Sequence, residues 1–159
     1  MPMSVFQSLV AALVLNHLDY CNSLLFNLPA ILIQRLQSVQ NNAARLIYNL
    51  RRFDHISDVL ISLHWPRMPQ RITFMVAVLT YRVLHGTAPP YLTSSFTYVA
   101  GMPHWCRLRS DQINVPFSVE STVGGRAFFV AGAKVWNSLP SDVTSAPSLP
   151  VFRNRLKTY

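Results

Sequence analysis

The spacing of apolar residues predicts a chain built mostly from α-helices. Between residues 30 and 50, apolar side chains recur at alternating steps of four and three, a spacing that places them on one face of a helix. The positions in this seam are Leu32, Leu36, Val39, Ala43, Leu46 and Leu50. We expect the seam to pack against a neighbouring helix.

An earlier segment, residues 5–18, predicts a helix with apolar side chains on every side. Helices of that kind are buried all round, not along one stripe. Polar residues interrupt the run at Gln7, Ser8, Asn16 and His17, so it is shorter than the ~20 apolar residues that cross a bilayer. We therefore expect a buried helix here and no membrane span.

Proline, glycine and aspartate mark the ends of the shorter helices. Asp54 is placed to cap a helix over 56–63, which must stop before Pro66. Pro69 suits the first turn of the next helix, and Gly86 can supply the left-handed residue that ends it. The inward face of that helix is expected to hold Ile72, Met75, Val76, Leu79 and Val83.

Helical periodicity fades between residues 88 and 123, where Pro, Ser and Thr are frequent. We predict loops there, apart from a helical turn at 90–94 and one short extended piece near 114–119. Helical spacing returns over 128–139 and 148–156. The predicted fold class is mostly α, a small helical bundle with a loop-rich middle and at most one short extended segment. Its parts are a helical region (1–87), a loop-rich connector (88–123) and a C-terminal helical segment (124–159).

The chain is strongly basic, with 14 Lys and Arg against 6 Asp and Glu, a formal net charge of +8 and a pI near 10.2. Such a composition favours polyanions, among them nucleic acid and anionic lipid. No long helix combines a Lys-rich polar face with a strongly apolar one, so lipid is the weaker alternative. The basic residues that we expect to contact phosphates are Arg45, Arg51, Arg52, Arg71, Arg82, Arg107, Arg109, Arg153, Arg155 and Lys157.

Aromatic residues are interleaved with these bases. Tyr48, Phe53 and Trp105 each lie within a few residues of an arginine. Stacking of bases on such side chains would favour single strands. The alternative interpretation is that the arginines near residue 50 complement the dipole at a solvated helix end. Trp65 and Trp136 sit in apolar patterns, and we expect them in the core.

The acidic residues disfavour the metal chemistry of a polymerase. Such an enzyme holds two divalent ions between clustered carboxylates. The acids here are Asp19, Asp54, Asp58, Asp111, Glu120 and Asp142, and no two are adjacent. The His17/Cys21 and His104/Cys106 pairs lack the further ligands that a metal site needs. We expect no enzyme activity, no catalytic residue, no cofactor and no metal site.

The cysteine content bears on the compartment. Cys21 and Cys106 are too few for the disulfide framework of a small secreted protein. We interpret both as reduced thiols of an intracellular protein, with nucleus and cytoplasm left open.

Short sequence motifs follow one another in a fixed order along most of the chain. The two most informative are Leu18-Asp19-Tyr20-Cys21-Asn22-Ser23-Leu24-Leu25 and Gly125-Arg126-Ala127-Phe128 leading to Trp136-Asn137-Ser138-Leu139-Pro140. Between them stand Arg35-Leu36-Gln37, Val39-Gln40-Asn41-Asn42-Ala43-Ala44-Arg45-Leu46, Asp54-His55-Ile56, Leu63-His64-Trp65, Arg71-Ile72, Leu79-Thr80-Tyr81, Leu84-His85-Gly86 and Leu108-Arg109-Ser110. The series resembles the C-terminal region of non-LTR retrotransposon reverse transcriptases of the LINE type, jockey-like or chicken-repeat-like.

The resemblance implies a thumb and the region that follows it, downstream of the polymerase palm. The parent enzyme of that family is an RNA-directed DNA polymerase. Two segments depart from the family pattern: Pro66-Arg67-Met68-Pro69 replaces a Leu-Pro-Val type of segment, and Gly132-Ala133-Lys134 stands where a proline is common.

Together these observations predict a non-catalytic C-terminal fragment of such a polymerase. Its expected partner is RNA or DNA, bound without sequence preference through basic helix faces. The alternative is a helical interaction module whose exposed apolar faces bind the missing polymerase part or a second copy of the chain.

Overall fold

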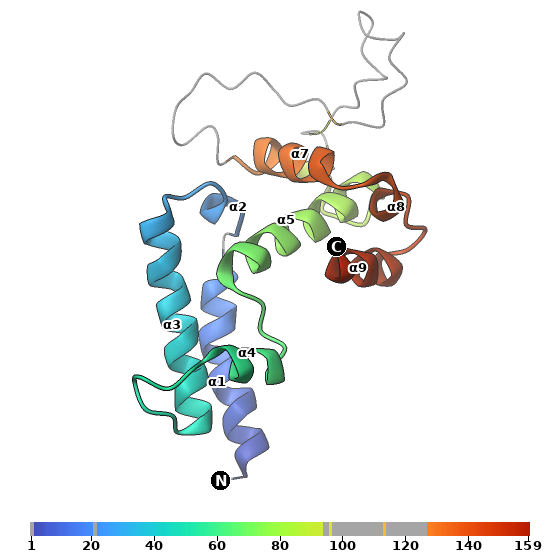
Figure 1. The fold of residues 1–159 in the computed structure, drawn as a ribbon. Coiled ribbons are helices and arrows are strands. Elements are labelled where there is room, and N and C mark those ends of the chain that lie inside the picture. Colours follow the sequence, from blue (N-terminus) through green and yellow to red (C-terminus); the bar gives the residue numbers. More distant parts are fainter. Residues whose placement is uncertain (1, 21, 94–95, 97–112, 114–126) are drawn as a thin grey trace, which may run out of the picture. The chain divides into compact units, whose positions relative to one another are not determined.

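The computed structural model describes residues 2–20, 22–93, 96, 113 and 127–159, and these residues form helices and connecting loops without a β-sheet (Figure 1). The mostly α fold class predicted from periodicity is confirmed. Contacts divide the chain into two compact units, Met1–Ile72 and Thr73–Tyr159, and helix α5 (Met68–Leu84) crosses the division. Among the described residues, no helix is long and apolar enough to cross a membrane.

The first unit is built on two long antiparallel helices. Helix α1 (Met3–Leu18) lies beside α3 (Ala30–Tyr48), the short α2 (Asn22–Leu25) stands between them in the chain, and α4 (Ser57–Ser62) packs on α3 (Figure 1). The core of this unit consists of Val10, Ala43, Ala44, Ile47, Leu60, Leu63 and Trp65. The burial of Trp65 confirms its predicted place in the core.

The predicted seam of α3 is only partly correct. Val39 and Leu46 are exposed, at 49% and 61%, whereas Gln40, Ala44 and Ile47 are buried. The buried stripe is therefore rotated by about one residue from the predicted one. This buried side includes a polar contact that apolar periodicity does not register, since Nε2 of Gln40 donates to the carbonyl oxygen of Pro66 at 3.0 Å.

Helix α1 is not buried on every side, which corrects the prediction for this segment. Val10 and Leu18 are buried, but Val5, Leu9 and Leu13 remain 50%, 47% and 58% exposed. These three side chains recur every fourth residue and so share one side of the helix. Apolar residues on every side allow a helix to be buried all round but do not require it. Within the described residues, other side chains cover only one side of α1.

Asp54 does not cap α4, contrary to the prediction. Its Oδ2 accepts a hydrogen bond from the backbone N–H of Arg51 at 2.7 Å, and no side chain caps α4, which is preceded by Ile56. Asp54 is the fourth residue of a tight turn that begins at Arg51. The carboxylate of Asp54 therefore bonds to the Arg51 N–H of this turn and not to the N–H groups at the start of α4.

Left-handed residues end two helices of the first unit. Asn49 follows α3 with φ 50°, and His64 follows α4 with φ 55°. In each case the next residue donates its N–H back across five residues, Leu50 to the carbonyl oxygen of Arg45 and Trp65 to that of Leu60. This pattern satisfies carbonyl groups that the helix end leaves open. It also turns the chain so that Trp65 enters the core.

The second unit contains the rest of α5 together with four shorter helices: α6 (Pro90–Thr93), α7 (Phe128–Ser138), α8 (Ser141–Thr144) and α9 (Leu149–Thr158). Helix α6 confirms the predicted helical turn near residue 90. Gly86 ends α5 with φ 68°, as predicted, and the N–H of Thr87 donates to the carbonyl oxygen of Arg82 at 2.8 Å. The extended piece predicted near 114–119 lies outside the described residues.

Three aromatic rings form the centre of the second unit. The ring of Phe152 lies 4.5 Å from that of Tyr81 and 5.9 Å from that of Trp136, centroid to centroid. The hydroxyl of Tyr81 donates to the carbonyl oxygen of Ala146 at 2.9 Å, so its polar end is satisfied inside the core. The buried position of Trp136 confirms its predicted role.

Candidate nucleic-acid interface

Arg71, one of the ten predicted phosphate ligands, is part of an ion pair. Its Nε lies 2.5 Å from Oδ1 of Asp19 and its Nη2 lies 2.5 Å from Oδ2, a bidentate contact between residues 52 positions apart. The two side chains are only 13% and 21% exposed. Both donors of this fork point at a carboxylate within the first unit, which leaves little of the guanidinium for a phosphate.

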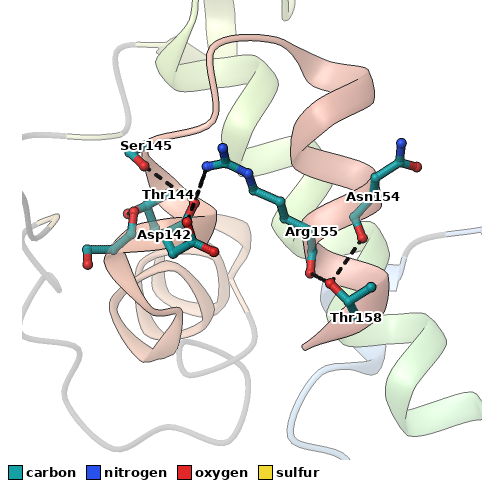
Figure 2. Close-up of polar contacts among 7 residues, drawn as sticks. Asp142, Thr144, Ser145, Asn154, Arg155 and Thr158 are labelled. Carbon is teal, nitrogen blue, oxygen red and sulfur yellow. Dashed lines mark hydrogen bonds and ion pairs between the residues drawn. The ribbon is translucent and has the colours of Figure 1, made fainter.

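Arg155 makes a longer and more exposed ion pair with Asp142, in the first turn of α8. Its Nη1 lies 3.6 Å from Oδ1 of Asp142 and donates to the backbone carbonyl of the same residue, a contact that Figure 2 shows. On the other side, the hydroxyl of Thr158 donates to the carbonyl oxygen of Arg155 at 2.8 Å. Arg155 therefore joins α9 to α8, and its charge is balanced locally.

Arg45 is partly buried on α3. Its Nη1 is 3.4 Å from Oδ1 of Asn42, a long contact, and its Nε is buried with no hydrogen-bond partner among the described residues. Its carbonyl oxygen takes the N–H groups that end α3. The side chain is thus directed partly into the protein and not fully into solvent.

The other predicted ligands that the structure describes are exposed: Arg51, Arg52, Arg82, Arg153 and Lys157. Of these, Arg82 makes a long contact from Nη2 to the carbonyl oxygen of Thr87 at 3.4 Å. Arg107 and Arg109 lie outside the described residues, as does Trp105.

Within the described residues, three exposed bases were not predicted as ligands: Arg35, Arg67 and Lys134. The sequence prediction grouped bases that are neighbours in the chain or share a helix edge, and these three stand apart from such groups. Their positive charge was the only signal that could have pointed to them.

Two exposed basic positions of α9 form a small cationic surface, the α9 face, defined by Arg153 and Lys157. The two are four residues apart, so they lie one above the other on the helix. Phe152, which comes directly before Arg153, is fully buried on another side of the helix. In the described residues the ion pairs are those of Arg71 and Arg155, so the α9 face has no acidic partner there.

A second exposed group is the 51–54 turn, which connects α3 to α4. Arg51 and Arg52 are exposed there, and Phe53 is 90% exposed. The turn is closed by two hydrogen bonds between its ends, from the Arg51 N–H to Oδ2 of Asp54 and from the Asp54 N–H to the carbonyl oxygen of Arg51. The turn thus places two exposed arginines beside an aromatic ring, on a piece of backbone closed by hydrogen bonds.

No group of three or more His, Cys, Asp or Glu side chains that could hold a metal ion occurs among the described residues. Comparison with known proteins found no match to a family model, to a curated protein or to a solved structure.

Proposed function

We propose that this chain is a non-catalytic, nucleic-acid-binding helical module that corresponds to the C-terminal part of a non-LTR retrotransposon reverse transcriptase. It holds RNA or DNA through phosphate contacts of exposed Arg and Lys side chains. Because phosphates are the same in every sequence, such binding has little sequence preference.

The observation that carries this proposal is that basic side chains outside ion pairs outnumber the acidic ones. Among the described acids, Asp19 and Asp142 pair with arginines, which leaves Asp54 and Asp58 outside the ion pairs. Exposed bases outside the ion pairs are more numerous and include Arg35, Arg51, Arg52, Arg67, Lys134, Arg153 and Lys157. The surface excess is positive, as polyanion binding requires.

The short motifs on which the proposed origin rests also make contacts within the fold. Asp19 and Arg71 belong to two motifs far apart in the sequence and form an ion pair with each other. Asn137 belongs to the motif that ends at Pro140. Its Nδ2 donates to the carbonyl oxygen of Ile113 at 2.9 Å, and its Oδ1 accepts from the N–H of Ile113 at 3.0 Å. Contacts between motifs that lie far apart in the sequence are expected of a segment that folds as one unit.

The direct test is retention of labelled RNA and single-stranded DNA on a filter by the purified chain at low salt. The proposal predicts saturable retention of strands of unrelated sequence, with similar affinities. Retention no greater than that of a neutral protein of the same size would contradict it.

The alternative function is a protein-interaction module, and a specific observation favours it. On α1, the exposed side of Val5, Leu9 and Leu13 forms an apolar stripe, and α3 leaves Val39 and Leu46 exposed. Apolar side chains grouped in this way are typical of surfaces that bind another chain. Light scattering after size exclusion tests self-association, since a monomer over a wide concentration range would argue against it.

A further inference from the structure

Phe53 is the most exposed large apolar side chain among the described residues, at 90%. It belongs neither to the core of the first unit nor to the exposed sides of α1 and α3, because it stands in the connection between α3 and α4, which projects from the two helices in Figure 1. Its ring therefore adds little to stability and is open to contact with a ligand.

The backbone that carries Phe53 is tied at both ends. Arg52 and Phe53 occupy the two central positions of the 51–54 turn, whose first and last residues exchange hydrogen bonds of 2.7 Å and 3.2 Å. Below the turn, the hydroxyls of Tyr48 and Ser62 lie 3.1 Å apart and join the ends of α3 and α4. A ring presented on such a turn loses less conformational entropy when it binds than one on a free loop.

The charges of this region decide what kind of contact the ring can make. Arg51 and Arg52 are exposed, while Asp54 and Asp58 offset their formal charge. The carboxylate of Asp54 accepts a hydrogen bond from the Arg51 N–H. Because two acids stand near the two arginines, the turn as a whole attracts phosphate only weakly. Affinity at this place must therefore come mainly from the ring.

We propose that Phe53 stacks on an unpaired nucleobase while Arg52, beside it, contacts the adjoining phosphate. The 51–54 turn is then a site for single-stranded RNA or DNA and not for duplex, whose bases are stacked on one another. Stacking on an aromatic side chain has no sequence preference, because every base has a flat face. This inference rests on the proposed function and adds the strand class to it.

The test compares strands that differ only in their bases. Fluorescence anisotropy is measured with labelled oligo-dT, oligo-U, an abasic strand of equal length and a duplex. The intact chain is expected to bind oligo-dT or oligo-U more tightly than the abasic strand. Phe53→Ala should weaken binding of the base-containing strand by about 5-fold to 100-fold and leave abasic binding and the salt dependence unchanged.

Two further variants sharpen the test. Phe53→Trp should retain binding, and its added indole fluorescence should be quenched when oligo-dT is bound. Tyr91→Ala is the matched control, since Tyr91 is an aromatic residue of α6 that is 74% exposed and has no arginine next to it in the sequence. It should bind all four ligands as the unaltered chain does. Thermal unfolding followed by circular dichroism should be the same for Phe53→Ala and the unaltered chain.

The outcomes separate this inference from the proposed function. Oligo-dT binding that survives Phe53→Ala unchanged overturns the inference and leaves the proposed function standing. An equal loss on oligo-dT and the abasic strand also overturns it, because the turn would then act on the backbone alone. A change confined to self-association would assign Phe53 to a protein contact instead. Failure of the intact chain to bind any strand removes the proposed function, and the inference with it.

Discussion

The side-chain Oε1 of Gln37 accepts a hydrogen bond from the backbone N–H of Met68 at 2.8 Å, although 31 residues separate the two in the chain. The neighbouring Gln40 donates to the carbonyl oxygen of Pro66, and Nε2 of Gln37 donates to Oε1 of Gln40. The two amides thus hold the segment before α5 against α3. They also satisfy backbone groups that the proline-rich connection leaves without a helical partner.

Gln40→Ala should destabilise the first unit, because Gln40 is completely buried and its removal leaves the carbonyl of Pro66 without its donor. We expect a loss of about 1–3 kcal/mol in the free energy of unfolding. Urea unfolding followed by circular dichroism measures it. Gln34→Ala, at an exposed position of the same helix, is the control and should stay within about 0.5 kcal/mol. Equal midpoints for the two variants would show that the amide contacts contribute nothing.

Arg71→Lys should not replace the arginine in its pair with Asp19. Lysine has a single charged centre and cannot form the two parallel hydrogen bonds that Nε and Nη2 make here. We expect a loss of about 1–3 kcal/mol for this partly buried pair, measured by the same unfolding experiment. Arg67→Lys, at an exposed position just before α5, should be neutral. A neutral Arg71→Lys would mean that the fork geometry is unimportant.

His64→Gly should stabilise the protein. His64 has φ 55°, a left-handed conformation that costs a residue with a Cβ atom roughly 1 kcal/mol and that glycine adopts freely. A rise in melting temperature is expected, reduced by the greater freedom of glycine in the unfolded chain. His55→Gly gives the comparison, because His55 is an exposed loop residue without a left-handed φ. It should lower the melting temperature, and a similar effect of the two substitutions would contradict the prediction.

Gly132→Ala should destabilise the second unit even though alanine favours helices. A Cβ atom at this position of α7 would lie 2.6 Å from Oγ1 of Thr80 and 2.8 Å from the Cζ atom of Phe96. Both are too close for real contacts, so side chains must shift, at a cost of about 1–3 kcal/mol. The double variant with Thr80→Ala should recover part of the loss. Stability at or above that of the unaltered chain would show that α7 has room at this point.

The helices were largely predictable, because most are long enough to show their period. Periodicity placed α5, α7 and α9, and the expected burial of Val76 and Trp136 is confirmed. It did not register α2 and α8, since four residues make barely one turn. The rotation of the α3 seam was also not predictable, because its buried side includes Gln40, a polar residue bonded to a carbonyl far along the chain.

The candidate site could be predicted only where exposure follows from helix geometry. Arg153 and Lys157 are exposed because Phe152 faces inward on the same helix. Arg71 and Arg155 looked equally available in the sequence, yet each has a carboxylate partner brought to it by the fold. Long-range pairs such as Asp19 with Arg71 leave no local pattern, so the sequence cannot separate paired bases from free ones.

The central claim is that exposed bases bind nucleic acid through phosphates, and the salt dependence of binding tests it most directly. For a single strand, four to six contacts predict a slope of log K against log salt of roughly −3 to −4. Removing the α9 face with Arg153→Gln and Lys157→Gln should make the slope shallower by about 1.4. A slope near zero for the unaltered chain would contradict the account.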